Sequence, residues 1–170
     1  LNRTTWVDAG VSTYPLATSG GYLYTHENGP NNGQPLGAAP VAMDSYIQSA
    51  FMDIADGEFY MLTKRVIPDV DFTASETSNP VTGATLVPAV DMAVAVTKFP
   101  GAATSTTDVG GTTLTRNIVT ATGTIDQYTN QVFIRARGRQ MNFKISSDTL
   151  GTQWQLGDAR VDAKPAGLRG

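Results

Sequence analysis

Apolar and polar residues alternate along most of the chain, and no long segment shows the period of an amphipathic helix. The clearest alternation lies at 86–99, where Asp91 and Thr97 share one face with two alanines. Both faces of this strand are therefore expected to be partly covered. Four apolar residues occupy the other face: Val90, Met92, Val94 and Val96. This pattern, rich in β-branched residues, predicts an all-β fold.

Several shorter strands follow from the same pattern. Tyr22, Tyr24 and His26 fall on one face of a short strand. The segment 44–54 fits a strand or a short helix, of which the strand is favoured, and Asp-Gly at 56–57 predicts a hairpin after it. Further strands are expected at 22–26, 59–67, 112–124 and 128–145. Their spacing favours an antiparallel sandwich or barrel. The alternation predicts five buried side chains: Val90, Met92, Val94, Phe143 and Ile145.

Three segments are predicted as loops. The segment 28–40 is rich in Asn, Gly and Pro, which adopt turn conformations at low cost. The segment 73–83 is also rich in turn residues. A low-complexity Thr/Ser/Gly segment at 102–111 is expected to be a mobile surface loop.

The inward face of the chain changes across Gly138. Apolar residues are mostly even-numbered in 132–138 and odd-numbered in 139–145. A β-bulge at Gly138 is predicted, because a bulge shifts the alternation by one residue and glycine tolerates its geometry. The bulge is expected to bring three arginines close together: Arg135, Arg137 and Arg139.

The charge is unevenly distributed. Charged residues make up only 16% of the 170 residues, so uncharged groups, above all threonine, must make the surface polar. The net charge of −3 combines −7 for residues 1–130 with +4 for residues 131–170. An acidic body thus precedes a basic C-terminal segment.

Composition narrows the function classes. Without cysteine, disulfides, thiolate metal sites and thiol nucleophiles are excluded. No apolar run is long enough for a membrane helix, and the N-terminus has no apolar signal core. Because the chain does not begin with Met, it is expected to be a fragment or a processed product of a longer protein.

Material for catalysis is sparse. His26 and Glu27 are adjacent, so on a strand they point to opposite faces and are poorly placed for a hydrogen bond. Asp108-Val109-Gly110-Gly111 lacks the Lys-Ser/Thr of a phosphate loop. The segment 53–58 resembles a calcium loop only superficially, and a hairpin turn explains it better. Two carboxylate pairs have the spacing for hydrolysis but also that of solvated strand ends: Asp69 with Asp71, and Asp158 with Asp162. The sequence therefore predicts no enzyme, metal site or cofactor.

The arginines of the basic segment have two interpretations. Arg135, Arg137 and Arg139 can contact phosphates of a nucleic acid. They can equally pair with carboxylates across a sheet or a subunit interface, since the rest of the chain is acidic. The second interpretation is favoured, and the predicted interface residues are Arg135, Arg137, Arg139 and Arg160.

A set of short motifs resembles one family. The motifs are Trp6-Val7-Asp8, the segment Gly21 to Gly29, Tyr46 to Ala50, Asp53 to Gly57, Arg65 to Asp69, Arg137 to Met141, Trp154 to Gly157 and Arg160 to Asp162. Together they resemble the C-terminal part of tail hub or nozzle proteins of short-tailed bacteriophages, also described as packaged-DNA stabilisation proteins. The resemblance extends over about residues 5–165. It departs from the family at Gln155 and at Pro165-Ala166-Gly167-Leu168.

This resemblance implies a non-enzymatic virion protein. Six copies would form a ring beneath the portal, next to portal, adaptor or other tail proteins, as part of the conduit that retains and releases the genome. DNA would pass without sequence-specific binding. It also implies that residues 1–30 complete a propeller blade and that 31–170 form an antiparallel β domain.

Two rival classes stay open. A carbohydrate-binding or adhesion module of a tail would use exposed aromatic residues as sugar platforms, although large aromatic residues more often belong to a core. The candidates are Tyr22, Tyr24 and Trp154. A depolymerase would need a carboxylate pair in a cleft.

Overall fold

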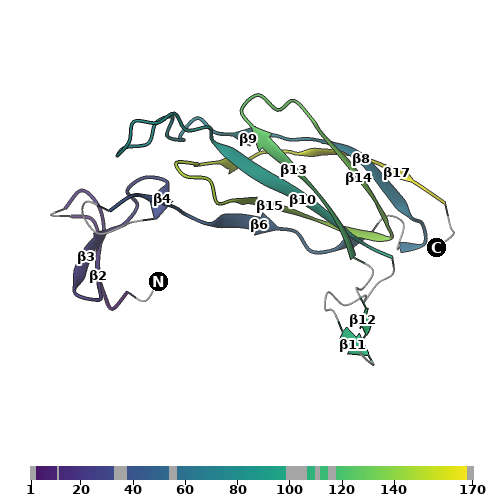
Figure 1. The fold of residues 1–170 in the computed structure, drawn as a ribbon, viewed down its shortest axis with the longest axis horizontal. Helices are drawn as coiled ribbons and strands as arrows, with labels where there is room; N and C mark the ends of the chain where they lie inside the picture. Colours follow the sequence, from purple (N-terminus) through teal and green to yellow (C-terminus); the bar gives the residue numbers. More distant parts are fainter. Residues whose placement is uncertain are drawn as a thin grey trace.

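The computed structural model describes residues 3–10, 12–32, 38–53, 57–98, 107–109, 112–114 and 118–167. Within them the fold is nearly all β and antiparallel, as predicted (Figure 1). No helix in this described part is long and apolar enough to cross a membrane. The strands are β1 (Thr5–Val7), β2 (Leu16–Ser19), β3 (Tyr22–Thr25), β4 (Asn31–Asn32), β5 (Val41–Ala42), β6 (Ser45–Gln48), β7 (Met52–Asp53), β8 (Met61–Ile67), β9 (Val70–Asp71), β10 (Ala89–Thr97), β11 (Thr107–Val109), β12 (Thr112–Leu114), β13 (Ile118–Asp126), β14 (Val132–Gly138), β15 (Gln140–Ser147), β16 (Gln155–Leu156) and β17 (Arg160–Pro165).

Two antiparallel sheets pack face to face as a sandwich. The large sheet has the order β13-β10-β15-β6, and β7 also pairs with β15. The small sheet has the order β14-β8-β17. The chain changes sheets from β13 in the large sheet to β14 in the small one, and returns to the large sheet in β15 (Figure 1).

The core lies between the two sheets. It holds the even-numbered apolar residues of β10 and β14 and the odd-numbered residues Met141 and Ile145 of β15. Of the five residues predicted to be buried, four are confirmed: Val90, Met92, Val94 and Ile145.

The prediction that Phe143 is buried is wrong. Phe143 packs against the core but is only half-buried. The small sheet has fewer strands than the large one, and two side chains of β6 and β7 are exposed although their partners in the register are buried. Ile47 lies opposite the buried Ile145 in the register, yet it is 52% exposed. Met52, opposite the buried Met141, is 45% exposed.

The predicted bulge at Gly138 is also wrong, although the change of inward face is confirmed. Gly138 ends β14 in the small sheet, and β15 begins at Gln140 in the large sheet. The Arg139 N–H between them donates to the Thr97 carbonyl at 2.7 Å. The alternation therefore shifts because the chain turns a corner of the sandwich. The register irregularity of β14 lies earlier, between Phe133 and Ala136.

A separate three-stranded sheet, β1-β2-β3, lies at one end of the long axis (Figure 1). Gly20 and Gly21 form its tight turn at φ 57° and 82°, which glycine adopts without strain. Tyr22 and Tyr24 contact each other with ring centroids 6.4 Å apart, as expected for side chains on one face. The boundary between 1–30 and 31–170, and the propeller blade, stay predictions.

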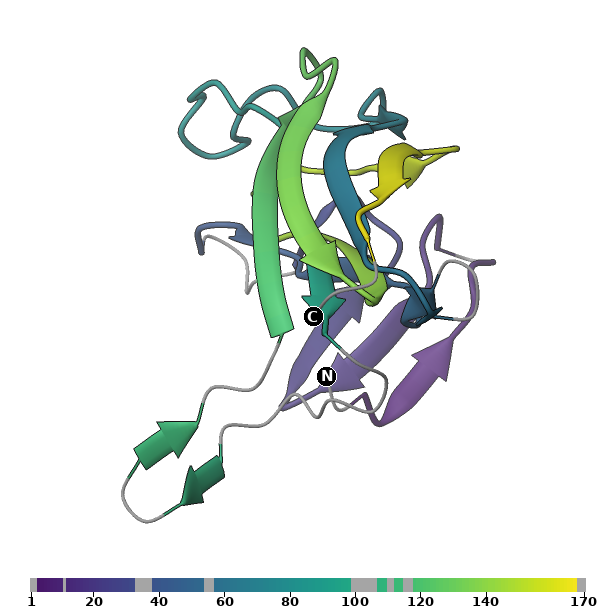
Figure 2. The same ribbon diagram turned by 90° about the vertical axis from the view of Figure 1, so that its right-hand side faces the viewer.

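The segments expected to be loops contain some strand. β4 lies inside the predicted loop 28–40, while 33–37 fall outside the described residues. Most of 102–111 also falls outside them, but its described part, β11, pairs with β12 in a hairpin that projects from the two packed sheets (Figure 2). The predicted strand 44–54 is divided into β6 and β7. Ile54 and the Asp56 of the predicted hairpin turn are outside the described residues.

Candidate interaction faces

The outer face of the small sheet gathers basic residues from all three of its strands. On β17, the register places Arg160 and Lys164 on the side away from the core, because Val161 between them lies opposite the buried Val66. On β14, the exposed positions alternate with buried Ile134 and Ala136. We call this set the basic face, and its members are Lys64, Arg65, Arg135, Arg137, Arg160 and Lys164.

A bulge in β8 exposes two consecutive cations. Thr63 and Arg65 each pair with a residue of β14 and with a residue of β17, whereas Lys64 between them pairs with neither strand. Thr63 and Val66 are both fully buried, while Lys64 and Arg65 between them are both exposed. Strict alternation would turn one of the two inward. The bulge therefore adds one charge to the outer face.

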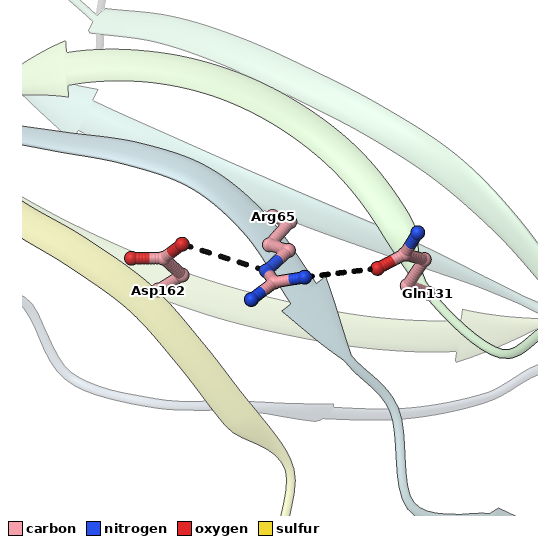
Figure 3. Close-up of polar contacts among 3 residues, drawn as sticks. All are labelled: Arg65, Gln131 and Asp162. Atoms are coloured by element: carbon pink, nitrogen blue, oxygen red, sulfur yellow. Dashed lines mark hydrogen bonds and ion pairs between the residues drawn. The ribbon is translucent and has the colours of Figure 1, made fainter.

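Arg65 is held between the neighbouring strands. Its Nε lies 3.4 Å from a carboxylate oxygen of Asp162 on β17. Its Nη1 donates to the Gln131 side chain at 3.2 Å, just before β14 (Figure 3). The Arg65 side chain stays 44% exposed. Asp162 is the acidic residue that the three strands contribute to this face, and Arg65 already engages it.

Arg137 and Arg139 meet at one end of the basic face. Their guanidinium carbons lie 4.8 and 5.2 Å from the centroid of the nearly buried Tyr60 ring. Arg137 Nη2 donates to the Ala166 carbonyl at 3.0 Å. Arg139 Nη1 donates to the Gly57 carbonyl at 3.4 Å and is half-buried. The structure thus brings these two together as predicted, but Arg139 binds within the fold and does not belong to the exposed face.

Carboxylates lie beside Arg160 at the other end. A hollow of about 290 Å³ is lined by Asp69, Asp158 and Arg160, with Ile67 and Pro68. The Asp69 carboxylate accepts the Asp158 N–H at 2.9 Å. The second carboxylate of the predicted pair, Asp71, accepts the N–H and hydroxyl of Thr73, and these bonds lower its pKa. Asp69 and Asp71 therefore stabilise turns, and the hollow reduces the positive potential around Arg160.

The outer face of the large sheet is acidic. Asp91 lies on it, opposite Ser146 in the register and accepting the Thr124 hydroxyl at 2.7 Å. A hollow of about 370 Å³ is lined by Asp44, Asp91, Asp148 and Lys144, among others. We call this set the acidic face, and its carboxylates are Asp44, Asp53, Asp91, Asp126 and Asp148.

Each face also exposes one aromatic side chain. Phe133 lies opposite Arg65 and is 72% exposed. Tyr46 on β6 is 70% exposed, with Lys144 Nζ 5.0 Å from its ring centroid. Exposed aromatic residues beside arginine are typical of protein interfaces.

In comparisons with known proteins, no family model, curated protein or solved structure matches this chain. The arrangement of charge on the two sheets is therefore the main physical guide to what the protein does.

The structure also describes the surroundings of the remaining candidate residues. His26 packs against Trp6 with ring centroids 4.7 Å apart, and its Nε2 is buried without a hydrogen-bond partner. No cluster of three or more metal-ligating side chains occurs among the described residues. Trp154 packs at the margin of the core, and its Nε1 donates to the Ser45 hydroxyl at 2.9 Å. Tyr22 is exposed on the N-terminal sheet.

Sequence reasoning identified half of the basic face. Arg135, Arg137 and Arg160 were predicted interface residues, and all three lie on it. Lys64, Arg65 and Lys164 were missed, because their place beside β14 depends on the strand order of the small sheet. The sequence signal that could have indicated them is the basic pair Lys64-Arg65 inside an alternating strand.

Proposed function

We propose that this chain is a structural subunit of a bacteriophage tail, in a hub or nozzle that assembles from copies of itself. The ring, expected to contain six copies beside portal, adaptor or other tail proteins, would form part of the conduit that retains and releases the genome. The resemblance of the sequence motifs supplies the biological setting. The single structural observation that supports self-assembly is the separation of positive and negative charge onto the two outer faces of the sandwich.

The separation matters because the two layers cannot neutralise each other. Packed sheets lie about 10 Å apart, which is near the Debye length at moderate salt. The charges on each outer face are therefore available to a neighbouring molecule. Their side chains stand on paired strands, so little conformational entropy of the backbone is lost on association.

The overall charge agrees with a passage for DNA. With a net charge of −3, the subunit repels phosphates on average. DNA then slides past without lasting contacts, provided that the basic face is turned toward other protein surfaces.

Native mass spectrometry of the purified chain at two salt concentrations tests the proposal. A discrete oligomer that dissociates as the salt concentration rises is the expected result, because its contacts join exposed charges. A monomer at all concentrations would contradict self-assembly. The same measurement on the protein isolated from its source particle would show whether a longer chain forms the ring.

A second candidate function, carbohydrate binding, is favoured by one cavity. It has a volume of about 490 Å³ and is lined by Trp154, Gln153 and Glu27, among others. An indole beside a carboxylate and an amide suits stacking and hydrogen bonding to a sugar. Glycan-array binding that Gln153→Ala abolishes would support this function. A blank array together with an oligomer would favour the structural subunit.

A further inference from the structure

We propose that neighbouring copies of the chain meet with the basic face of one against the acidic face of the next. This inference rests on the proposed self-assembly and specifies its contact. The partner of each face is thus a second copy of this chain.

The position of the two faces requires a head-to-tail contact. The basic face covers the small sheet and the acidic face covers the large sheet, on opposite sides of the shared core. A two-fold contact would place each face against itself and oppose charges of the same sign. Like charges facing each other destabilise a contact, whereas opposite charges favour it. A head-to-tail contact repeats until it closes as a ring or extends as a filament.

The basic face carries cations that its own chain leaves without a partner. Within the described residues, the side chains of four of its members make no hydrogen bond, ion pair or ring contact: Lys64, Arg135, Arg160 and Lys164. Arg135 stands on β14 between buried residues, so its backbone position is fixed by the core. An exposed guanidinium on a rigid strand forms paired hydrogen bonds with a carboxylate at low entropic cost.

The acidic face carries the matching carboxylates. Asp44 and Asp148 line the 370 Å³ hollow together with Asp91, and neither of these two carboxylates accepts a hydrogen bond within the described residues. Lys144 beside them already lies over the Tyr46 ring. The hollow therefore fits an arginine or lysine side chain from a neighbour.

The exposed aromatic residues fit the same contact. Phe133 is surrounded by Arg65 on β8 and Arg135 on its own strand, where an interface would remove its apolar ring from water. Tyr46 occupies the rim of the acidic hollow. Both faces thus combine unpartnered charge with one apolar anchor.

Duplex DNA is the competing partner for the basic face. It would explain the cations and, by stacking or packing, the exposed Phe133. It would leave the acidic face, with its unpartnered Asp44 and Asp148, without a partner. A second copy of the chain accounts for both faces and is favoured for that reason.

Reciprocal charge reversal tests the contact. One variant reverses the basic face (Lys64→Glu with Arg135→Glu), and the other reverses the acidic face (Asp44→Lys with Asp148→Lys). All four side chains are at or near the surface and lack partners, so the fold should be retained; circular dichroism and thermal unfolding verify this. Each variant alone should associate at least tenfold more weakly than wild type in sedimentation at low salt. An equimolar mixture should regain association, because each reversed face then meets its complement.

The controls separate the possible failures. Asp8→Lys with Glu27→Lys changes two exposed charges in the N-terminal segment, outside both faces, and should assemble like wild type. If both charge-reversal variants also assemble like wild type, this contact is overturned while self-assembly stands. If wild type never associates, both proposals are overturned. The wild type and the basic-face variant are also tested for binding to a 30-base-pair duplex by electrophoretic mobility shift. If the wild type stays monomeric and binds this duplex while the basic-face variant does not, the basic face binds DNA and the contact is overturned.

Discussion

Gly138 lies against Thr97 so closely that a Cβ added at Gly138 would come within 2.6 Å of the Thr97 carbonyl oxygen. The same Cβ would lie 2.7 Å from the Cβ of Val96. This close approach is where the chain leaves the small sheet and enters the large one. This corner therefore divides the basic C-terminal segment between the two sheets. β14 carries Arg135 and Arg137 on the small sheet, while β15 carries Lys144 on the large one.

Gly138→Ala should destabilise the protein by about 1–3 kcal/mol, because backbone atoms of Thr97 must move to admit the methyl group. Urea unfolding followed by circular dichroism measures the change. Gly10→Ala is the matched control, since a Cβ there meets nothing within 4 Å. Equal stability of the two variants would contradict the tight corner.

Burial on the two sides of the sandwich predicts a contrast between two isoleucines. Ile134→Ala should cost about 2–5 kcal/mol, since Ile134 is 1% exposed between the sheets. Ile47→Ala should cost much less, because Ile47 is 52% exposed on the uncovered side of the large sheet. Urea unfolding of both variants measures the difference. A large loss for Ile47→Ala would show that the small sheet reaches over β6.

The turn between β13 and β14 predicts a pH dependence. Asp126 accepts the Thr129 hydroxyl at 2.7 Å and the Tyr128 N–H at 2.9 Å, and these bonds lower its pKa from the ordinary 3.8. Because the pKa of this carboxyl is lower in the folded state than in the unfolded state, the group stabilises the fold at pH values above its unfolded pKa. This stabilisation is lost as the pH falls through the folded pKa. Thr129→Val should therefore reduce stability near neutral pH and reduce the loss of stability below about pH 4. Thermal unfolding between neutral and acid pH measures both effects. An unchanged acid slope would contradict the role of this bond.

The ion pair of Arg65 and Asp162 should contribute little to folding. Both side chains are partly exposed, and such pairs contribute about 0.2–1 kcal/mol. A double-mutant cycle with Arg65→Met and Asp162→Asn measures the coupling. A coupling of several kcal/mol would mean that the pair is a major stabilising element of the small sheet.

The sequence was sufficient to predict the all-β fold class and four of the buried core residues. Period-two alternation reports directly which side of a strand is apolar, and Val90, Met92 and Val94 are buried as expected. Phe143 has the same pattern but is only half-buried at the margin of the core. Alternation identifies the inner face of a strand, but it contains no information on how far the opposite layer extends.

The complete basic face could not be predicted from the sequence alone, for a related reason. Arg135 and Arg137 are close in sequence and were predicted as interface residues from it. Lys164 joins them on the same face only because β17 pairs with β8. Lys64 is exposed through a bulge that depends on the register with both neighbours. Long-range pairing and register therefore decide which charges share a surface.

Zero-length carbodiimide cross-linking of a mixture of unlabelled and ¹⁵N-labelled protein tests the central claim most directly. The reagent joins a lysine amine to a carboxylate in contact with it, and mixed-isotope products identify links between different copies. We expect links from Lys64 or Lys164 of one copy to Asp44, Asp91 or Asp148 of another. An assembled oligomer whose mixed-isotope links all avoid the two faces would contradict the account.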